Sequence, residues 1–243
     1  LIAFLFLTRL PIKFKREITE VHLASSSSYF PLVGLVLGVG GGGIVYLFAP
    51  VLPLSIRIIL ASAFFTILTG ALHLDGFMDT LDGIGCGGDR EKKLSVMRDS
   101  RVGAYGATGV SFLLLFKFLL LWELGQKGEI LIPLLIAMPL VSRWAMVMSM
   151  YKSTYPRQKG LGRAFVELVS LKEVMIATLI TGAALYLLIP SALYTLPLIL
   201  AASLITRKFF VASLGGITGD TLGFINEEAE ALFLLVSLIA ATA

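Results

Sequence analysis

Long uninterrupted apolar runs are the feature of this sequence that most restricts its fold. Six of them approach the roughly 20 residues that a helix needs to cross a bilayer, and they fill residues 30–52, 56–72, 104–124, 130–150, 174–189 and 193–214. A final apolar run to Ala243 is shorter, so a seventh helix would be tilted or incomplete. Charged residues make up only 15% of the chain, whereas soluble domains have about 25%. The sequence therefore predicts an all-α, polytopic membrane bundle of about seven transmembrane helices, forming one domain over residues 1–243.

The distribution of basic residues predicts how this bundle is oriented. Residues 1–29 are expected to form an N-terminal interfacial segment, and if it is cytoplasmic, the polar segments 73–103, 151–173 and 215–230 share its side. The opposite side then has only Arg57 and Lys127. The cytoplasmic side would hold Arg9, Lys13, Lys15, Arg16, Arg90, Lys92, Lys93, Arg98, Arg101, Lys152, Arg157, Lys159, Arg163, Lys172, Arg207 and Lys208. Because positive residues favour the cytoplasmic side, we expect a multi-pass protein of the cell inner (plasma) membrane, with its polar loops facing the cytoplasm.

The net charge of +4 has a simple explanation in this setting. Basic residues that flank apolar spans reflect membrane topology, so we expect the lipid bilayer as a partner and no nucleic acid. The single Cys86 excludes an internal disulfide. Whether the chain forms a homo-oligomer stays open.

The most informative polar stretch follows directly after the second apolar run. It contains Asp75, Asp79 and Asp82, which a continuing helix would keep within an arc of roughly 60°. Like charges on one face repel each other, and a cation would remove that penalty. Oxygen ligands favour Mg²⁺, Mn²⁺ or Ca²⁺ over zinc. We interpret the acids as a metal site, and the alternative is a solvated helix end without chemistry.

Basic residues in the first two polar segments suit a phosphate-bearing ligand. Arg98 and Arg101 follow the acids, and a diphosphate can bridge a metal ion and a guanidinium group. Arg157 and Lys159 stand beside glycines that let the backbone approach a phosphate. For all four, anchoring to lipid headgroups is the alternative. Arg143 lies inside an apolar run, so a partner or ligand is expected for it.

Further candidate residues lie around the acids and in the third polar segment. We choose Asp220 and Glu227 as additional metal ligands, because acids after a glycine-rich turn suit either metal binding or helix capping. His73, two residues before Asp75, is a candidate base or ligand, with a structural hydrogen-bonding role as the alternative. Lys117 inside the third apolar run either snorkels or pairs with an acid.

These motifs together resemble the signature of the cobalamin synthases, the adenosylcobinamide-GDP ribazoletransferases. The resemblance is carried by His73-Leu-Asp75-Gly-Phe-Met-Asp79-Thr-Leu-Asp82-Gly and by Met97-Arg-Asp99-Ser-Arg-Val-Gly-Ala-Tyr105-Gly106. It extends to the segments 8–11, 29–34, 155–157, 160–162 and 215–220, and thus to most of the chain. Phe224 and Ile225 depart from the pattern, which has smaller residues there, and this concerns local packing only.

The resemblance implies an enzyme of cobalamin (vitamin B12) biosynthesis that requires Mg²⁺. Such a transferase joins adenosylcobinamide-GDP to alpha-ribazole or its 5′-phosphate, and it releases GMP. On this interpretation Asp75, Asp79 and Asp82 hold the metal, and Asp220 or Glu227 completes the site.

The remaining candidates would act on the substrates. The predicted phosphate-binding residues are Arg98, Arg101, Arg157 and Lys159, with Arg143 as a further substrate-binding residue. We choose Asp82 to accept the proton of the ribose hydroxyl, with Asp79 and His73 as the other catalytic candidates.

Two other functions stay open at this level. A CDP-alcohol phosphotransferase also uses spaced aspartates at a membrane surface, but its Ala-Arg pair and fourth aspartate are not found in this sequence. A cation transporter would place acids in the middle of its spans and balance its loops across both faces. Here the acids cluster at one interface beside basic residues.

Overall fold

The computed structural model describes residues 1–12, 17–128, 130–160 and 162–242, and these residues form helices and no strands. The predicted all-α class is thereby confirmed. Lys13, Lys15 and Arg16 of the charge count, and Leu161 of the glycine-rich motif, lie outside the described residues. The elements are α1 (Ile2–Leu7), α2 (Glu20–Ser26), η1 (Ser27–Tyr29), α3 (Phe30–Leu47), α4 (Leu54–Thr69), α5 (Leu72–Gly85), α6 (Arg90–Val96), α7 (Ala104–Gln126), α8 (Leu131–Met150), α9 (Arg163–Leu168), α10 (Leu171–Leu188), η2 (Pro190–Tyr194), α11 (Thr195–Leu214) and α12 (Gly219–Thr242).

Within the described residues, five helical segments are long and apolar enough to cross a membrane. They are Glu20–Leu47, α7, α8, α10 and Pro190–Leu214. The pair α4 and α5 passes the same test only when taken together, and its two helices are bent by 84°. We therefore count α4 with the crossing helices and place α5 outside them. These five or six candidate spans agree with the expected polytopic helical bundle, and the expected number of about seven stays a prediction.

Two segments expected to be polar loops are largely helical instead. Residues 73–103 contain α5 and α6, and residues 215–230 are a short turn followed by the first half of α12. The last helix was expected to be short, but it has 24 residues. The final apolar run is shorter than this helix because the helix already begins at Gly219, before the acidic residues. The candidate carboxylates consequently stand on helices, which fixes their spacing.

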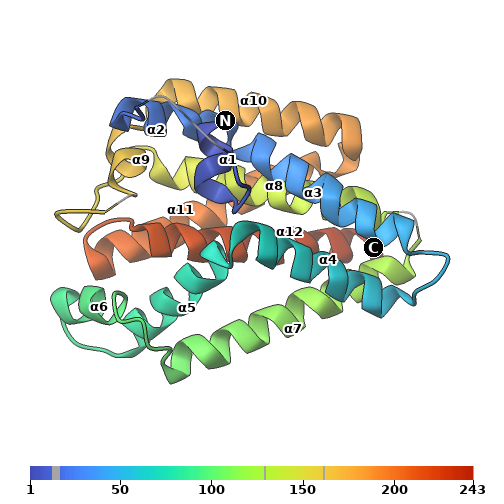
Figure 1. The fold of residues 1–243 in the computed structure, drawn as a ribbon, viewed down its shortest axis with the longest axis horizontal. Coiled ribbons are helices and arrows are strands. Elements are labelled where there is room, and N and C mark those ends of the chain that lie inside the picture. The colour runs from blue at the N-terminus through green and yellow to red at the C-terminus, as the bar shows by residue number, and fades with distance from the viewer. Residues whose placement is uncertain (13–16, 129, 161, 243) are drawn as a thin grey trace.

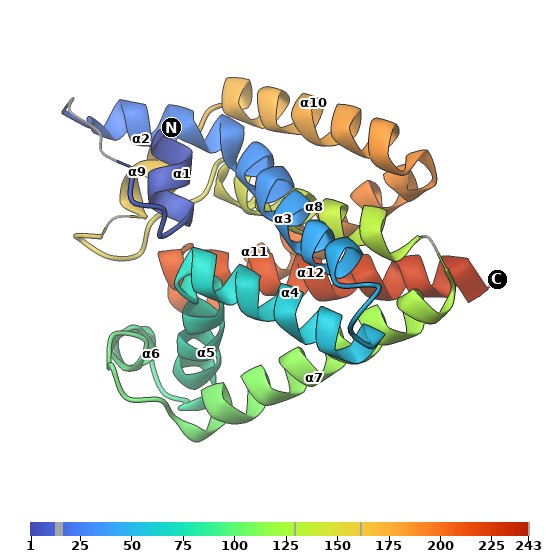
Figure 2. The same ribbon diagram turned by 45° about the vertical axis from the view of Figure 1, so that its right-hand side comes forward.

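The helices surround α8, nearly all of whose side chains are buried. Figures 1 and 2 show α3 and α10 on one side of it and α11 and α12 on another, while α4 packs against α3 and α7. Below them, α5 leads away from the end of α4 towards α6 and the start of α7 (Figure 1). This arrangement leaves α5 in contact with α12 on one side and α7 on the other.

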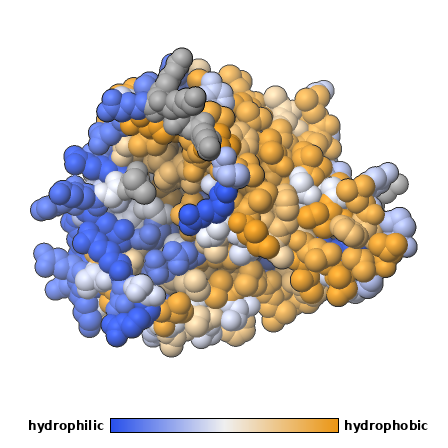
Figure 3. Space-filling model, in the orientation of Figure 1, coloured by the Kyte–Doolittle hydropathy of each residue, from blue (hydrophilic) through white to orange (hydrophobic). Residues whose placement is uncertain are grey.

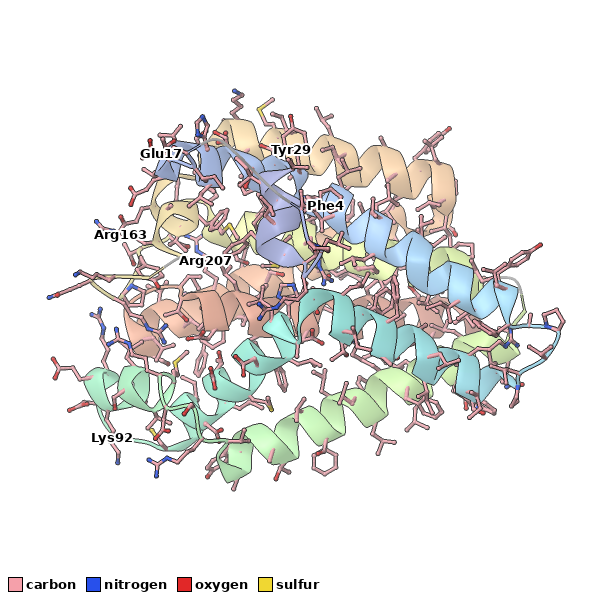
Figure 4. The ribbon with its side chains drawn as sticks, viewed as in Figure 1. Phe4, Glu17, Tyr29, Lys92, Arg163 and Arg207 are labelled. Carbon is pink, nitrogen blue, oxygen red and sulfur yellow. The ribbon has the colours of Figure 1, made fainter. Side chains whose placement is uncertain are left out.

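The polar side chains gather at one end of the molecule. Figure 3 shows hydrophilic residues over the left-hand end and hydrophobic residues over most of the rest of the visible face. The labelled side chains of Glu17, Lys92, Arg163 and Arg207 all lie at that left-hand end (Figure 4). The segments expected to carry chemistry thus share one end of the bundle.

Glycines on α3 allow its close approach to α8. A Cβ atom on Gly34 would collide with the carbonyl oxygen of Pro139, and one on Gly38 would collide with that of Ile136. Small residues at such crossings let two helix backbones meet, which is how membrane helices gain packing energy. The glycine-rich first span is therefore explained by helix packing.

This packing yields a stability prediction. Gly34→Ala should lower the free energy of unfolding by about 1–3 kcal/mol, because a backbone carbonyl cannot move aside for the added methyl group. Gly43 on the same helix has open space around an added Cβ, so Gly43→Ala should leave stability unchanged or raise it by up to ~1 kcal/mol. Thermal unfolding of both variants in detergent measures the difference. Equal melting temperatures would contradict the close crossing of α3 and α8.

Candidate active site

The candidate site begins at the sharp bend between α4 and α5. Gly70 and Ala71 both adopt left-handed backbone conformations, with φ of 62° and 58°. Their N–H groups donate to the carbonyls of Ile67 at 3.1 Å and Thr66 at 2.8 Å, which closes the end of α4. Glycine suits this type of helix ending because it has no Cβ. The bend of 84° then turns α5, with its acids, away from the direction of α4.

A close crossing of α5 and α12 brings acids from two distant segments together. A Cβ on Gly76 would lie 2.8 Å from the main-chain oxygen of Asp220, and one on Gly223 would lie 2.9 Å from that of His73. Only residues without a side chain permit this approach. Asp75 and Asp79 on α5 consequently face Asp220 in the first turn of α12 closely enough to interact electrostatically.

The electrostatics of Asp79 reflect this crowding. Burial raises the pKa of Asp79 to about 7, and the charges of Asp75, Asp220 and Asp82 act in the same direction while Arg157 opposes them. Like charges and burial both penalise an ionised carboxylate. A bound cation would relieve both penalties, so this group of acids is suited to one.

The arrangement also limits how an ion would be bound. Among the described residues, no three His, Cys, Asp or Glu side chains are already gathered so that they could hold a metal. Mg²⁺ typically takes one or two carboxylates and completes its shell with water and substrate phosphates. A single ion here would therefore be bound by one or two of Asp75, Asp79 and Asp220, with its shell completed by other ligands.

The second polar segment reaches these acids because it is fastened to the turn before α12. The Thr154 hydroxyl donates to the carbonyl of Gly215 at 3.0 Å, and the N–H of Ile217 donates to the carbonyl of Thr154 at 2.9 Å. Arg157, three residues further on, places Nη2 2.7 Å from Oδ2 of Asp220. The structure thus brings one predicted phosphate-binding cation into direct contact with the acids.

The other predicted phosphate-binding residues of the loops lie apart from this contact. Arg98 and Lys159 are exposed, and Arg101 pairs with Asp99 at 2.6 Å while remaining 87% exposed. Within the described residues none of these three forms an ion pair with the aspartates of α5 or α12.

Asp82 faces different partners from its neighbours on α5. It is buried, and its two carboxylate oxygens accept the N–H groups of Gly103 and Gly106, each at 2.8 Å. The oxygens that we expected to bind metal and accept a proton are therefore already engaged by the start of α7.

Two other predicted site residues, Arg143 and Glu227, belong to a separate, buried ionic cluster. Arg143 and Lys117 both pair with Glu230, and Lys117 also pairs with Glu227 at 2.9 Å. His73, which is only 3% exposed, borders a cavity of about 450 Å³ between α4 and α7 together with these four charged residues. The cluster links α7, α8 and α12 inside the bundle.

Helix geometry explains why these residues do not reach the acidic site. Glu227 follows Asp220 by seven residues, which is about 10 Å along α12. His73 precedes Asp75 by two residues and therefore lies about 160° away around α5. Among the described residues, Glu227, His73 and Arg143 thus form no ion pair or hydrogen bond with the aspartates, and Arg143 has the buried partner that was expected as one alternative for it.

Sequence reasoning gave Glu230 no role and left Lys117 undecided. A signal for both was present, because two cations stand inside apolar runs and two acids stand three residues apart in the last helix. Charges at membrane depth usually pair with one another. The equal number of basic residues (Lys117 and Arg143) and acidic residues (Glu227 and Glu230) within apolar segments therefore indicated that they pair with one another.

Comparison with known proteins places this site in context. The model of a family described as cobalamin-5-phosphate synthase matches residues 1–238. The chain is 39% identical to the adenosylcobinamide-GDP ribazoletransferase of Syntrophobacter fumaroxidans, over 96% of this chain and 94% of that relative. It is 38% identical to the enzyme of the same name from Clostridium novyi (96% and 93% covered) and 32% identical to that from Shigella boydii (96% and 96%). No solved structure matches the chain.

Proposed function

This chain belongs to the cobalamin-5-phosphate synthase family, and we propose that it joins adenosylcobinamide-GDP to alpha-ribazole or alpha-ribazole 5′-phosphate and releases GMP. The product would be adenosylcobalamin or its 5′-phosphate. The observation that carries the proposal is the meeting of Asp75, Asp79 and Asp220 with Arg157 at the polar end of the bundle. Acids for a cation beside a guanidinium group suit a reaction at a diphosphate.

Each residue of the site has a role in this reaction. Asp75, Asp79 and Asp220 would hold Mg²⁺, which supplies positive charge to the phosphoryl group and to the departing phosphate. Arg157 would bind a phosphate oxygen, because its fork of N–H donors matches that group. Through a carboxylate oxygen that is not committed to the metal, Asp79 would also accept the proton of the attacking ribose hydroxyl. It suits this role better than Asp82, because the Asp79 carboxylate accepts no hydrogen bond within the described residues, whereas Asp82 accepts two.

The proposal includes a location. We place the protein in the cell inner membrane with the polar end in the cytoplasm, where water-soluble substrates reach it. The support is the charge distribution, because the basic residues labelled in Figure 4 lie at the left-hand end of the molecule, where Figure 1 shows α5. The family match over residues 1–238 favours this transferase over a CDP-alcohol phosphotransferase or a cation transporter.

Metal removal tests the proposed reaction directly. Purified protein in detergent should form GMP from adenosylcobinamide-GDP and alpha-ribazole when Mg²⁺ is present. EDTA should abolish GMP formation, because the phosphate charges would then lack their cation, and added Mg²⁺ should restore it. Liquid chromatography of the nucleotide products measures this.

This experiment distinguishes a wrong metal role from a wrong overall function. Undiminished GMP formation in EDTA would overturn the metal role and leave the transferase activity intact. No GMP under any metal condition, from protein shown to be folded, would overturn the proposed function itself. Detergent also excludes transport as the readout, since transport requires a sealed vesicle.

A further inference from the structure

The start of α7 has no capping side chain of its own. Its N-cap residue is Gly103, and no side-chain hydrogen bond caps the helix from within it. The first N–H groups of any helix lack partners inside that helix. Here Asp82 of α5 supplies two hydrogen-bond acceptors: its Oδ2 accepts from the N–H of Gly103, and its Oδ1 accepts from the N–H of Gly106. A carboxylate at this position is also favoured by the positive end of the helix dipole.

The fit around this carboxylate leaves no space for side chains. A Cβ on Gly106 would lie 2.5 Å from Oδ2 of Asp82 and 2.9 Å from the main-chain oxygen of Met78. A Cβ on Gly103 would collide with the same carboxylate. Asp82, Gly103 and Gly106 therefore form one unit, which we call the α7 clamp.

The segment before the clamp is fastened to α5 at its other end as well. Met97 is 2% exposed, and it packs so closely on Gly83 that a Cβ there would meet both the Met97 side chain and, at 3.0 Å, the main-chain oxygen of Lys93. Residues 98–102 thus lie between two points of attachment on the acidic helix. They include Arg98 and Arg101, both of them exposed.

We propose that Asp82 is a positioning residue, which through the α7 clamp holds the basic segment 98–102 beside the acids of α5 for binding of the phosphate-bearing substrate. This inference rests on the proposed function for its substrate. Its structural part, the clamping of the segment by a carboxylate, stands independently. It reassigns Asp82 from metal binding and proton transfer to the attachment of α7.

The test compares Asp82→Asn, Gly106→Ala and the double variant. Asn can accept at only one atom, and Ala at position 106 forces the carboxylate away, so each change should free residues 98–102. Limited trypsin cleavage after Arg98 and Arg101 should accelerate by about tenfold or more in both single variants, since hydrogen bonds to a charged group are among the stronger ones. The double variant should be cleaved no faster than the faster single variant, because both changes break the same unit.

Kinetics separate positioning from chemistry. Each single variant should raise KM for adenosylcobinamide-GDP several-fold, with a smaller change in kcat and an unchanged Mg²⁺ concentration at half-maximal rate. Asp79→Asn is the matched control, because it should lose activity without faster cleavage.

Normal cleavage of Asp82→Asn together with lost GMP release or a raised Mg²⁺ requirement would overturn the proposal in favour of a direct role. If Asp82→Asn does not fold, Gly106→Ala alone decides the matter: unchanged cleavage in that variant would also overturn the proposal. The cleavage assay needs no substrate, so its result does not depend on whether the proposed function is correct.

Discussion

Replacing Asp79 with Asn should abolish Mg²⁺-dependent GMP release while the protein stays folded. Asp79 lies at the centre of the acids, with Asp75, Asp220 and Asp82 all contributing to its environment. Asn removes one negative charge and weakens the binding of a cation that would neutralise the phosphates. Loss of a group that stabilises transition-state charge costs about 10²–10³-fold in rate, and loss of the ion as well should exceed this. Initial rates of GMP formation at saturating substrate measure the effect.

Matched variants make this result interpretable. Asp75→Asn and Asp220→Asn should cause large losses as well, because their carboxylates share the site with Asp79. Glu91→Gln on the exposed side of α6 removes an acid from the same polar end and should leave the rate unchanged. Circular dichroism and the melting temperature establish that each variant is folded. Full activity of Asp79→Asn would remove the metal site from the proposed mechanism.

Glu230→Gln should be among the most destabilising single changes in the chain. Glu230 pairs with both Lys117 and Arg143 and is 5% exposed. Removing one partner of a buried ion pair leaves an uncompensated charge, and this costs about 3–5 kcal/mol. The glutamine side chain would keep one neutral acceptor oxygen in place of two charged ones, so it could accept from only one of the two cations and would compensate the charge of neither. Thermal unfolding in detergent should show a clear fall in melting temperature.

The neighbouring glutamates provide the comparison. Glu227→Gln should destabilise less, because Lys117 retains Glu230. Glu228 accepts a hydrogen bond from the Thr206 hydroxyl at 2.7 Å, and Gln can preserve it, so Glu228→Gln should cost no more than about 1 kcal/mol. If all three variants melted at the same temperature, the buried cluster would have no special part in stability.

Hydrophobic runs were sufficient to predict most of the fold. The runs at 104–124 and 130–150 correspond to α7 and α8 within a few residues, since a membrane requires every backbone polar group to pair within its own helix. The bend at Gly70 and Ala71 was not predicted. A single glycine often occurs within membrane helices, and an alanine in a left-handed conformation has no signal in the sequence.

The candidate site could be predicted only where local spacing determines it. Asp75 and Asp79 were placed on one helix face by their spacing, and Arg157 and Asp220 by their glycine-rich surroundings. The sequence could not identify the partners of Glu227 and Arg143, which are Lys117 and Glu230, because which helices meet, and at which depth, is decided by tertiary packing. Asp82 shows the same limit, since its partners at residues 103 and 106 lie beyond a separate helix.

The crossing of Gly76 and Gly223 has a consequence for biogenesis. The two halves of the acidic site lie on α5 and α12 and are separated in the sequence by the helices α6 to α11 and their connections, so a nascent chain that has released α5 from the ribosome still lacks Asp220. Reactive chemistry at the membrane surface would therefore be withheld until α12 has been synthesised. Two co-expressed fragments divided between α9 and α10 should regain turnover only when they associate.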